Sequence, residues 1–199
     1  MTPKTIAFYG ISGSGKGTQA ELLIKLLNEQ DSQRKTVYAE MGGLIRAFFK
    51  QDTPLSKRTQ VIVSKGGLLD TFLPTYLLAD FFNTSRFEGD EHLIMDGVGR
   101  RPVQAELAHE MMSFYGRSDL HVVVLDVPVE AARDRLLLRG RNDDTEDAIQ
   151  KRAAWFAEHV MPAIGKLEEL GWKIHHVNGH KTIEEVRYDI LEVLGLGEK

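Results

Sequence analysis

Short apolar runs alternate with longer amphipathic stretches along most of the chain. Five apolar runs are typical of buried strands and cover residues 5–9, 36–39, 92–95, 121–127 and 173–177. Helical patterns separate them near residues 21–27, 101–115, 129–138, 146–170 and 182–194. Strands that alternate with helices in this way predict a parallel sheet covered on both faces. The expected fold is therefore an α/β three-layer sandwich around a five-stranded parallel sheet.

The stretch from about residue 42 to residue 85 breaks this alternation. Its pattern is mostly helical, and glycine or proline interrupts it at Gly42-Gly43, Pro54, Gly66-Gly67 and Pro74. It is too long for a simple crossover between strands, so we expect a small inserted helical lobe. Pro162 is expected to kink the long helix at 146–170.

Length and composition limit the class of protein. The chain has 199 residues, and 25 lysines and arginines against 29 aspartates and glutamates give a formal net charge of −4. The length fits one domain, and the weak acidic balance does not support a general nucleic-acid binder. The absence of cysteine excludes disulfides, thiol nucleophiles and zinc or iron–sulfur sites built from thiolates. No apolar run approaches the ~18 residues of a membrane span, and the N-terminus does not resemble a signal peptide. We therefore expect a cytoplasmic protein with no membrane partner.

The clearest motif follows the first expected strand and opens the first expected helix. It reads Gly10-Ile11-Ser12-Gly13-Ser14-Gly15-Lys16-Gly17-Thr18-Gln19. Glycines let such a loop turn its backbone N–H groups onto a polyphosphate, the helix start adds partial positive charge, and Lys16 adds a full charge. The spacing matches a P-loop through Lys16, but Gly17 occupies the usual serine or threonine position and Thr18 follows it. A glycine-rich turn with a surface lysine is the alternative, and the agreement of strand, loop, lysine and helix favours phosphate binding.

Arginines gather in the second half of the chain where phosphoryl transfer would use them. Arg100 follows the third expected strand, at the edge of a parallel sheet where ligands bind. Arg135 and Arg139 share one helix face, and Arg141 and Arg152 follow. Transfer between phosphates needs fixed cations on several elements, and the planar fork of arginine binds phosphate oxygens in pairs. A solvated helix face is the alternative for any single arginine, so the prediction rests on their joint placement.

Four segments resemble motifs of the adenylate kinase family, the short nucleoside-monophosphate kinases of the P-loop NTPase superfamily. Residues 15–19 read Gly-Lys-Gly-Thr-Gln, as in that family's P-loop. Residues 96–105 are similar to its Asp-Gly-Phe-Pro-Arg-Thr-x-x-Gln-Ala signature, with Val98-Gly99 in place of Phe-Pro. Residues 41–46 resemble its Thr-Gly-Asp-x-x-Arg, with Met41 for the threonine and Gly43 for the aspartate, and Gly66-Gly67-Leu68-Leu69 resembles Gly-x-Leu-Val.

This resemblance covers nearly the whole chain and implies its organisation. One P-loop kinase domain would span residues 1–199, with a core of 1–39, 86–138 and 146–199. The helical lobe at 40–85 would bind the acceptor nucleotide, and a very short lid would occupy 139–145. The four-cysteine zinc lid of some longer relatives cannot form, so no zinc is expected.

The resemblance also implies roles for individual residues. ATP would be bound by Gly13, Ser14, Gly15, Lys16, Gly17, Thr18, Arg135 and Gly179. The acceptor would be bound by Met41, Gly42, Arg46, Leu69, Gly97, Arg100, Gln104, Arg141 and Arg152. The migrating charge would be stabilised by Lys16, Arg100, Arg139, Arg141 and Arg152. Asp96 would hold the Mg²⁺ of MgATP through water, and Asp143 and Asp144 would help to hold the lid closed.

The implied reaction is the reversible transfer of the γ-phosphoryl of MgATP to a nucleoside monophosphate by a monomeric enzyme. Gln104 favours AMP as the acceptor, giving two ADP, although Met41 removes a polar partner of the base. A kinase for UMP, CMP or another monophosphate is one alternative. A nucleotide-binding regulator that has lost catalysis is a second, motivated by Met41, Gly43 and the short lid, and an ATPase acting on a protein partner is a third. Retention of the phosphate-side arginines argues against the last two.

Overall fold

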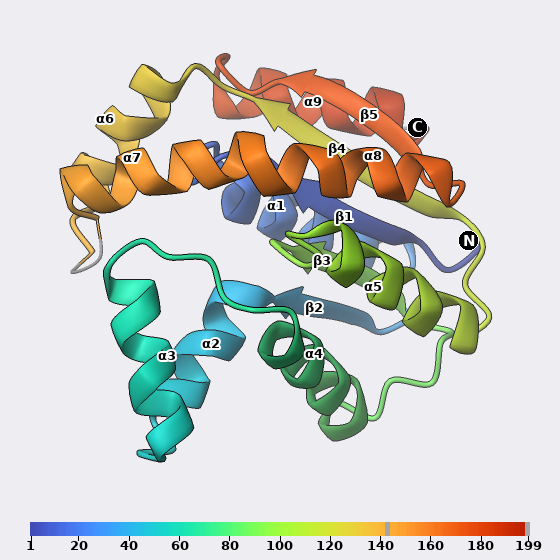
Figure 1. Cartoon of the computed structure of the whole chain (residues 1–199). Coiled ribbons are helices and arrows are strands. Elements are labelled where there is room, and N and C mark those ends of the chain that lie inside the picture. Colours follow the sequence, from blue (N-terminus) through green and yellow to red (C-terminus); the bar gives the residue numbers. More distant parts are fainter. Residues whose placement is uncertain (142–143, 198–199) are drawn as a thin grey trace.

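A five-stranded parallel sheet lies at the centre of the computed structural model, which describes residues 1–141 and 144–197 (Figure 1). Its strands are β1 (Thr5–Tyr9), β2 (Thr36–Glu40), β3 (His92–Asp96), β4 (Leu120–Asp126) and β5 (Lys173–Asn178). Their order across the sheet is β2-β3-β1-β4-β5, and every neighbouring pair is parallel. The predicted α/β class and the five predicted strands are confirmed.

Helices cover both faces of this sheet, because side chains along a strand point alternately to its two sides. Ile6 and Phe8 of β1 pack in the cluster formed with α1 (Lys16–Gln30) and α9 (Ile183–Val193). Ala7 and Tyr9 pack in the cluster on the other face, which includes α5 (Pro102–Phe114) and α8 (Met161–Glu169). All of β1 is buried, as its uninterrupted apolar sequence requires.

The segment between β2 and β3 is helical and stands to one side of the sheet (Figure 1). It contains α2 (Met41–Phe49), α3 (Pro54–Ser64) and α4 (Phe72–Thr84). The start of α3 is well specified, because Thr53 and Ser56 form a reciprocal capping box and Pro54 occupies the first turn. This segment packs on the sheet through α2 and α4, whose Ile45, Leu73 and Leu77 join the cluster on the α5 face.

The long helix predicted at 146–170 is interrupted before Pro162. After α6 (Val129–Arg139), the chain forms α7 (Glu146–Trp155), a π-helical turn η1 (Phe156–Val160) and then α8. Proline has no N–H, and its ring crowds the carbonyl four residues earlier, so a regular helix cannot pass through this point. The irregular turn therefore precedes Pro162, which itself stands in the first turn of α8. No helix among the described residues is long and apolar enough to span a bilayer.

Candidate active site

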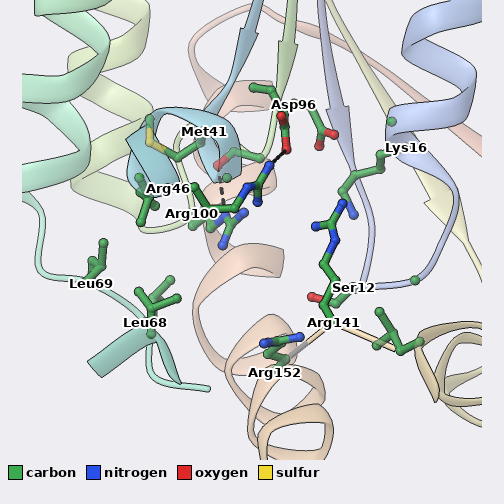
Figure 2. A pocket seen from close by; sticks show the side chains of 18 of the residues that line it. Ser12, Lys16, Met41, Arg46, Leu68, Leu69, Asp96, Arg100, Arg141 and Arg152 are labelled. Carbon is green, nitrogen blue, oxygen red and sulfur yellow. Dashed lines mark hydrogen bonds and ion pairs between the residues drawn. The ribbon is translucent and has the colours of Figure 1, made fainter. Parts of the chain in front are cut away.

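A cleft of about 990 Å³ opens at the carboxyl ends of the strands (Figure 2). Parallel pairing brings these ends to one edge, where Glu40 of β2 lies opposite Asp96 of β3. The segments that follow β1, β2 and β3 line the cleft, together with residues 67–69 and parts of α6 and α7. This edge of the sheet is where open parallel α/β folds bind their ligands.

Almost all of the predicted site residues meet in this cleft. Those that line it are Gly13, Gly15, Lys16, Gly17, Thr18, Met41, Gly42, Arg46, Leu69, Asp96, Gly97, Arg100, Gln104, Arg135, Arg139, Arg141 and Arg152. Two predicted residues stand behind the lining, since Ser14 is buried and Gly179 lies in the segment after β5. Asp143 lies outside the described residues.

The Gly10–Gln19 loop wraps the start of α1. Gly15 has φ of 98° and precedes the first helical residue, in a left-handed conformation that favours glycine. A side chain at Gly13 would come within 2.5 Å of the Ala132 carbonyl oxygen, so the loop packs directly on α6. The Lys16 ammonium donates to the carbonyl oxygens of Gly10 and Ile11, both at 2.9 Å. The Lys16 side chain thus folds back over the loop that precedes its own helix.

The charge on Lys16 is held in an unfavourable environment. Burial lowers the pKa of Lys16 to about 8, and repulsion from Arg100 and Arg139 adds to this effect against the attraction of Asp96. An anion bound beside the lysine would reverse the shift, because it favours the charged form.

Arg135 joins the loop to the segment after β5. Its guanidinium donates to the carbonyl oxygens of Ser14 at 3.5 Å and Gly179 at 3.2 Å. Ser14 and Gly179, which do not line the cleft, are therefore both hydrogen-bonded to Arg135, which does. This arrangement places Arg135 between the Gly10–Gln19 loop and the segment that follows β5.

Arg100 and Gln104 are oriented by each other and by the backbone. The Arg100 side chain donates through Nε to the carbonyl oxygen of Gly97 at 2.9 Å, and the Arg100 backbone N–H donates to Gln104 Oε1 at 3.0 Å. Gln104 is only 5% exposed, and its buried Nε2 has no hydrogen-bond partner within the part of the chain that the structure describes. A buried amide donor without a partner is costly, so this group is suited to donate to a ligand in the cleft.

Glu40 is a residue of the site that the sequence analysis missed. Its Oε1 accepts from Arg46 Nη2 at 2.8 Å. A side chain at Gly43 would come within 2.7 Å of Glu40 Oε2, so the two adjacent glycines leave room for this carboxylate. One signal could have found it, because Glu40 ends a strand at the same edge as Asp96 and directly precedes Met41.

Asp144 connects the arginines of α6 and α7. Its side chain has no exposed area and accepts two hydrogen bonds from Arg139, at 2.9 and 2.8 Å, and one from Arg152 at 3.0 Å. The backbone N–H of Arg141 also lies 3.4 Å from it. Burial by itself would raise the pKa of Asp144, but the hydrogen bonds from Arg139 and Arg152 together outweigh it and hold the pKa below its usual value.

Asp96 is the carboxylate available for a metal ion on β3. Burial raises the pKa of Asp96, against the attraction of Lys16 and Arg100. Among residues 1–141 and 144–197, no group of three or more histidine, cysteine, aspartate or glutamate side chains could hold a metal ion. Mg²⁺ keeps several waters and often uses one or two carboxylates with substrate phosphates. The residues therefore fit a Mg²⁺ that arrives with a phosphate ligand and reaches Asp96 through water.

Comparison with known proteins gives a consistent result. Residues 8–171 match the family model described as adenylate kinase. Adenylate kinase 1 of Nostoc sp. is 31% identical over 192 residues, which cover 96% of this chain and 98% of the relative. Adenylate kinase of Thermus thermophilus is 32% identical over 197 residues, which cover 97% and 98%. Adenylate kinase of Bacteroides fragilis is 31% identical over 193 residues, which cover 95% and 97%.

Proposed function

The chain belongs to the adenylate kinase family of phosphotransferases, and we propose that its cleft transfers the γ-phosphoryl of MgATP reversibly to AMP. The observation that carries the proposal is the convergence of five cations on one cleft, from the phosphate loop, the segment after β3, the lid and α7. They are Lys16, Arg100, Arg139, Arg141 and Arg152 (four of them labelled in Figure 2). Such an array suits a reaction that brings two polyanions together.

The donor nucleotide would lie along the Gly10–Gln19 loop. The backbone N–H groups after Gly13 and the start of α1 would bind its phosphates, and Lys16 would follow the transferring group. Arg135 would lie against the adenine, beside the Gly179 backbone that it already contacts. Asp96 would hold the Mg²⁺ of MgATP through water.

Nucleotide binding is expected to take up protons at alkaline pH. Since the pKa of Lys16 is about 8, roughly three quarters of this group is neutral at pH 8.5 and only about a tenth at pH 7. Bound triphosphate favours the charged form, so binding should add about three quarters of a proton per site at pH 8.5 and about a tenth at pH 7. Isothermal titration calorimetry with MgATP, in two buffers of different ionisation enthalpy, measures the number of protons taken up on binding.

The control for this measurement is Lys16→Arg, because arginine stays protonated across the range. Its proton uptake at pH 8.5 should be close to zero. Equal uptake by the variant and the wild type would contradict the assignment of the titration to Lys16.

The acceptor would lie on the other side of the cleft, in the lobe at 40–85. Arg46 and Arg100 would bind its phosphate, and the unpartnered Nε2 of Gln104 would donate to an acceptor atom on the base edge, such as N1 of adenine. Met41 and Leu69 would supply apolar contacts to the base. Gly97, Gly42, Arg141 and Arg152 complete this side of the cleft.

Catalysis would depend on position and charge, with no covalent enzyme intermediate. Direct transfer requires the acceptor oxygen and the leaving oxygen to lie roughly in line with the γ-phosphorus. Arg100, Arg139, Arg141 and Arg152 would compensate the charge that spreads over the migrating group, and Asp144 orients two of them. Closing the lid at 139–145 would exclude water, which would otherwise hydrolyse ATP. By resemblance to the family, we propose that the enzyme acts as a monomer in the cytoplasm.

An acceptor panel tests the proposal. The purified protein is incubated with MgATP and AMP, UMP, CMP, dAMP or GMP in turn, or with no acceptor, and products are separated by chromatography. AMP should be converted to ADP much faster than any pyrimidine monophosphate is converted to its diphosphate. Little ATP should be hydrolysed in the sample without acceptor. Faster phosphorylation of UMP or CMP than of AMP would show that the acceptor is a pyrimidine nucleotide. Hydrolysis without acceptor would indicate an ATPase, and binding of ATP without any product would indicate a regulator.

A further inference from the structure

Trp155, at the end of α7, connects two parts of the acceptor side that are distant in sequence. Its indole Nε1–H donates to the carbonyl oxygen of Gly66 at 2.9 Å. Its ring lies under the guanidinium of Arg100, with 5.5 Å between Arg100 Cζ and the ring centroid. Trp155 also lines the cleft. One side chain thus contacts the loop expected to receive the base and the arginine expected to bind the phosphate.

The loop at Gly66 is built to approach α7 closely. Gly66 has φ of +73°, and a Cβ placed there would lie 2.7 Å from Cα of Ala148 and 2.8 Å from its carbonyl oxygen. The backbone of the loop therefore packs directly on α7, which only glycine permits at this position. A second contact holds the other end of the loop, since Arg101 Nε lies 3.4 Å from the carbonyl oxygen of Leu69.

The backbone after Trp155 is also unusual. The π-helical turn η1 begins at Phe156, directly after the tryptophan. Turns of this kind inside α-helices are rare and often occur at functional sites. Here the turn separates α7, whose Arg152 and Trp155 line the cleft, from α8, whose Ala163 and Ile164 pack in the core.

We propose that Trp155 is a positioning residue for the acceptor, and this inference rests on the proposed function. Its ring fixes the Arg100 guanidinium, because a cation is attracted to the face of an aromatic ring. Its N–H ties the loop at residues 66–69 to α7. Packing of the loop on α7 and placement of Arg100 therefore depend on the same side chain, and a base bound at the loop would favour both.

Two substitutions separate the two contacts. Trp155→Phe keeps an aromatic face for Arg100 and removes the hydrogen bond to Gly66, whereas Trp155→Leu removes both. A lost hydrogen bond corresponds to about a fivefold rise in the KM for AMP, with kcat close to wild type. Loss of both contacts should raise this KM about 30-fold and lower kcat about tenfold, because Arg100 is then misplaced during transfer. The KM for MgATP should change less than twofold in both variants.

Trp172→Phe is the matched control. Trp172 is buried, and its Nε1–H donates to His109 Nδ1 at 3.2 Å, outside the residues that line the cleft. The same substitution therefore removes the same kind of hydrogen bond from the core. Circular dichroism verifies that each variant folds, and the KM for AMP in Trp172→Phe should stay within twofold of the wild type.

Fluorescence supplies a readout that general loss of stability would not produce. The chain has two tryptophans, so Trp155 is the sole tryptophan in Trp172→Phe and can be excited selectively over the tyrosines. AMP alone should change its emission with a saturation midpoint that matches AMP binding measured by calorimetry. Adenosine, which lacks the phosphate, should give a smaller change.

The outcomes separate this inference from the proposed function. A wild type that transfers nothing to AMP would overturn both. A wild type that uses AMP, with Trp155 variants of unchanged KM for AMP, would overturn the inference alone. It would be overturned equally if KM for MgATP and AMP rose together, or if AMP left the emission of Trp155 unchanged.

Discussion

Arg100→Ala is expected to lower kcat for phosphoryl transfer to AMP by about 10³-fold, while the fold stays intact. An arginine that contacts the transferring group in kinases and related enzymes contributes on the order of 10³–10⁵ in rate. Arg100 is held for this role by the Gly97 carbonyl and the Trp155 ring, on the acceptor side of the cleft opposite Lys16. A loss of 10³ corresponds to about 4 kcal/mol of transition-state stabilisation. A coupled assay for ADP measures it.

The stability of this variant should not fall. Burial lowers the pKa of Arg100, and repulsion from Arg152 adds to this against the attraction of Asp96, so the positive charge is itself unfavourable in the folded protein. Removal of this charge should offset the loss of the Gly97 and Trp155 contacts, so the melting temperature should stay close to that of the wild type. Arg133→Ala is the control, because this arginine is partly exposed and pairs with Glu146 outside the cleft lining. Near-normal turnover by Arg100→Ala would refute the assignment of this arginine.

Asp144→Asn is expected to lower kcat/KM for both nucleotides by about 10²-fold. A carboxylate can accept the paired donors of Arg139 and the donor of Arg152 together, whereas an amide turns an NH₂ group toward one of these cations. The two arginines would then repel each other and lose their orientation. Steady-state kinetics with each substrate varied in turn measures the loss.

The same substitution should destabilise the fold in a manner that depends on pH. The pKa of Asp144 is lower in the folded state than its usual 3.8, so the charged carboxylate stabilises the fold above that value. This contribution is lost as pH falls through the folded-state pKa. The difference in unfolding free energy between wild type and variant should therefore be full at pH 7 and shrink below about pH 4.

Asp147→Asn is the matched control for Asp144→Asn. Asp147 pairs with Lys151 at 2.6 Å on the exposed face of α7, the helix that follows Asp144, and their side chains are 75% and 52% exposed. Such surface pairs contribute about 0–1 kcal/mol, so neither activity nor stability should change much. Equal effects of the two substitutions would show that the burial of Asp144 has no special consequence.

Much of this molecule follows from local sequence pattern. The three central strands β1, β3 and β4 were predictable because each is a short apolar run that is buried on both faces, as in Val122-Val123-Val124-Leu125. The site was predictable where a motif is contiguous, as in the Gly10–Gln19 loop, because parallel strands bring such loops to one edge. The interruption of the long helix was predicted from Pro162, and the structure places it in the turn before the proline.

The residues that were missed act through contacts that no local pattern records. Trp155 reaches Gly66, 89 positions earlier in the chain, and only the folded lobe brings them together. It does lie three residues after Arg152, on the same helix face, which was the available signal. To identify Glu40 as a site residue, one must know that Gly42 and Gly43 leave space for its carboxylate beside Arg46. The glycines alone only suggest this space.

The Glu40–Arg46 pair gives the acceptor side an anion of its own. The Glu40 carboxylate would compete with a phosphate for Arg46, which reduces the electrostatic gain of binding. Orthophosphate or pyrophosphate has no base with which to engage Gln104 and would gain little from this contact. A complete nucleotide can offset the competition through base and phosphate contacts together. We therefore expect the pair to favour a complete nucleotide over orthophosphate or pyrophosphate on this side of the cleft.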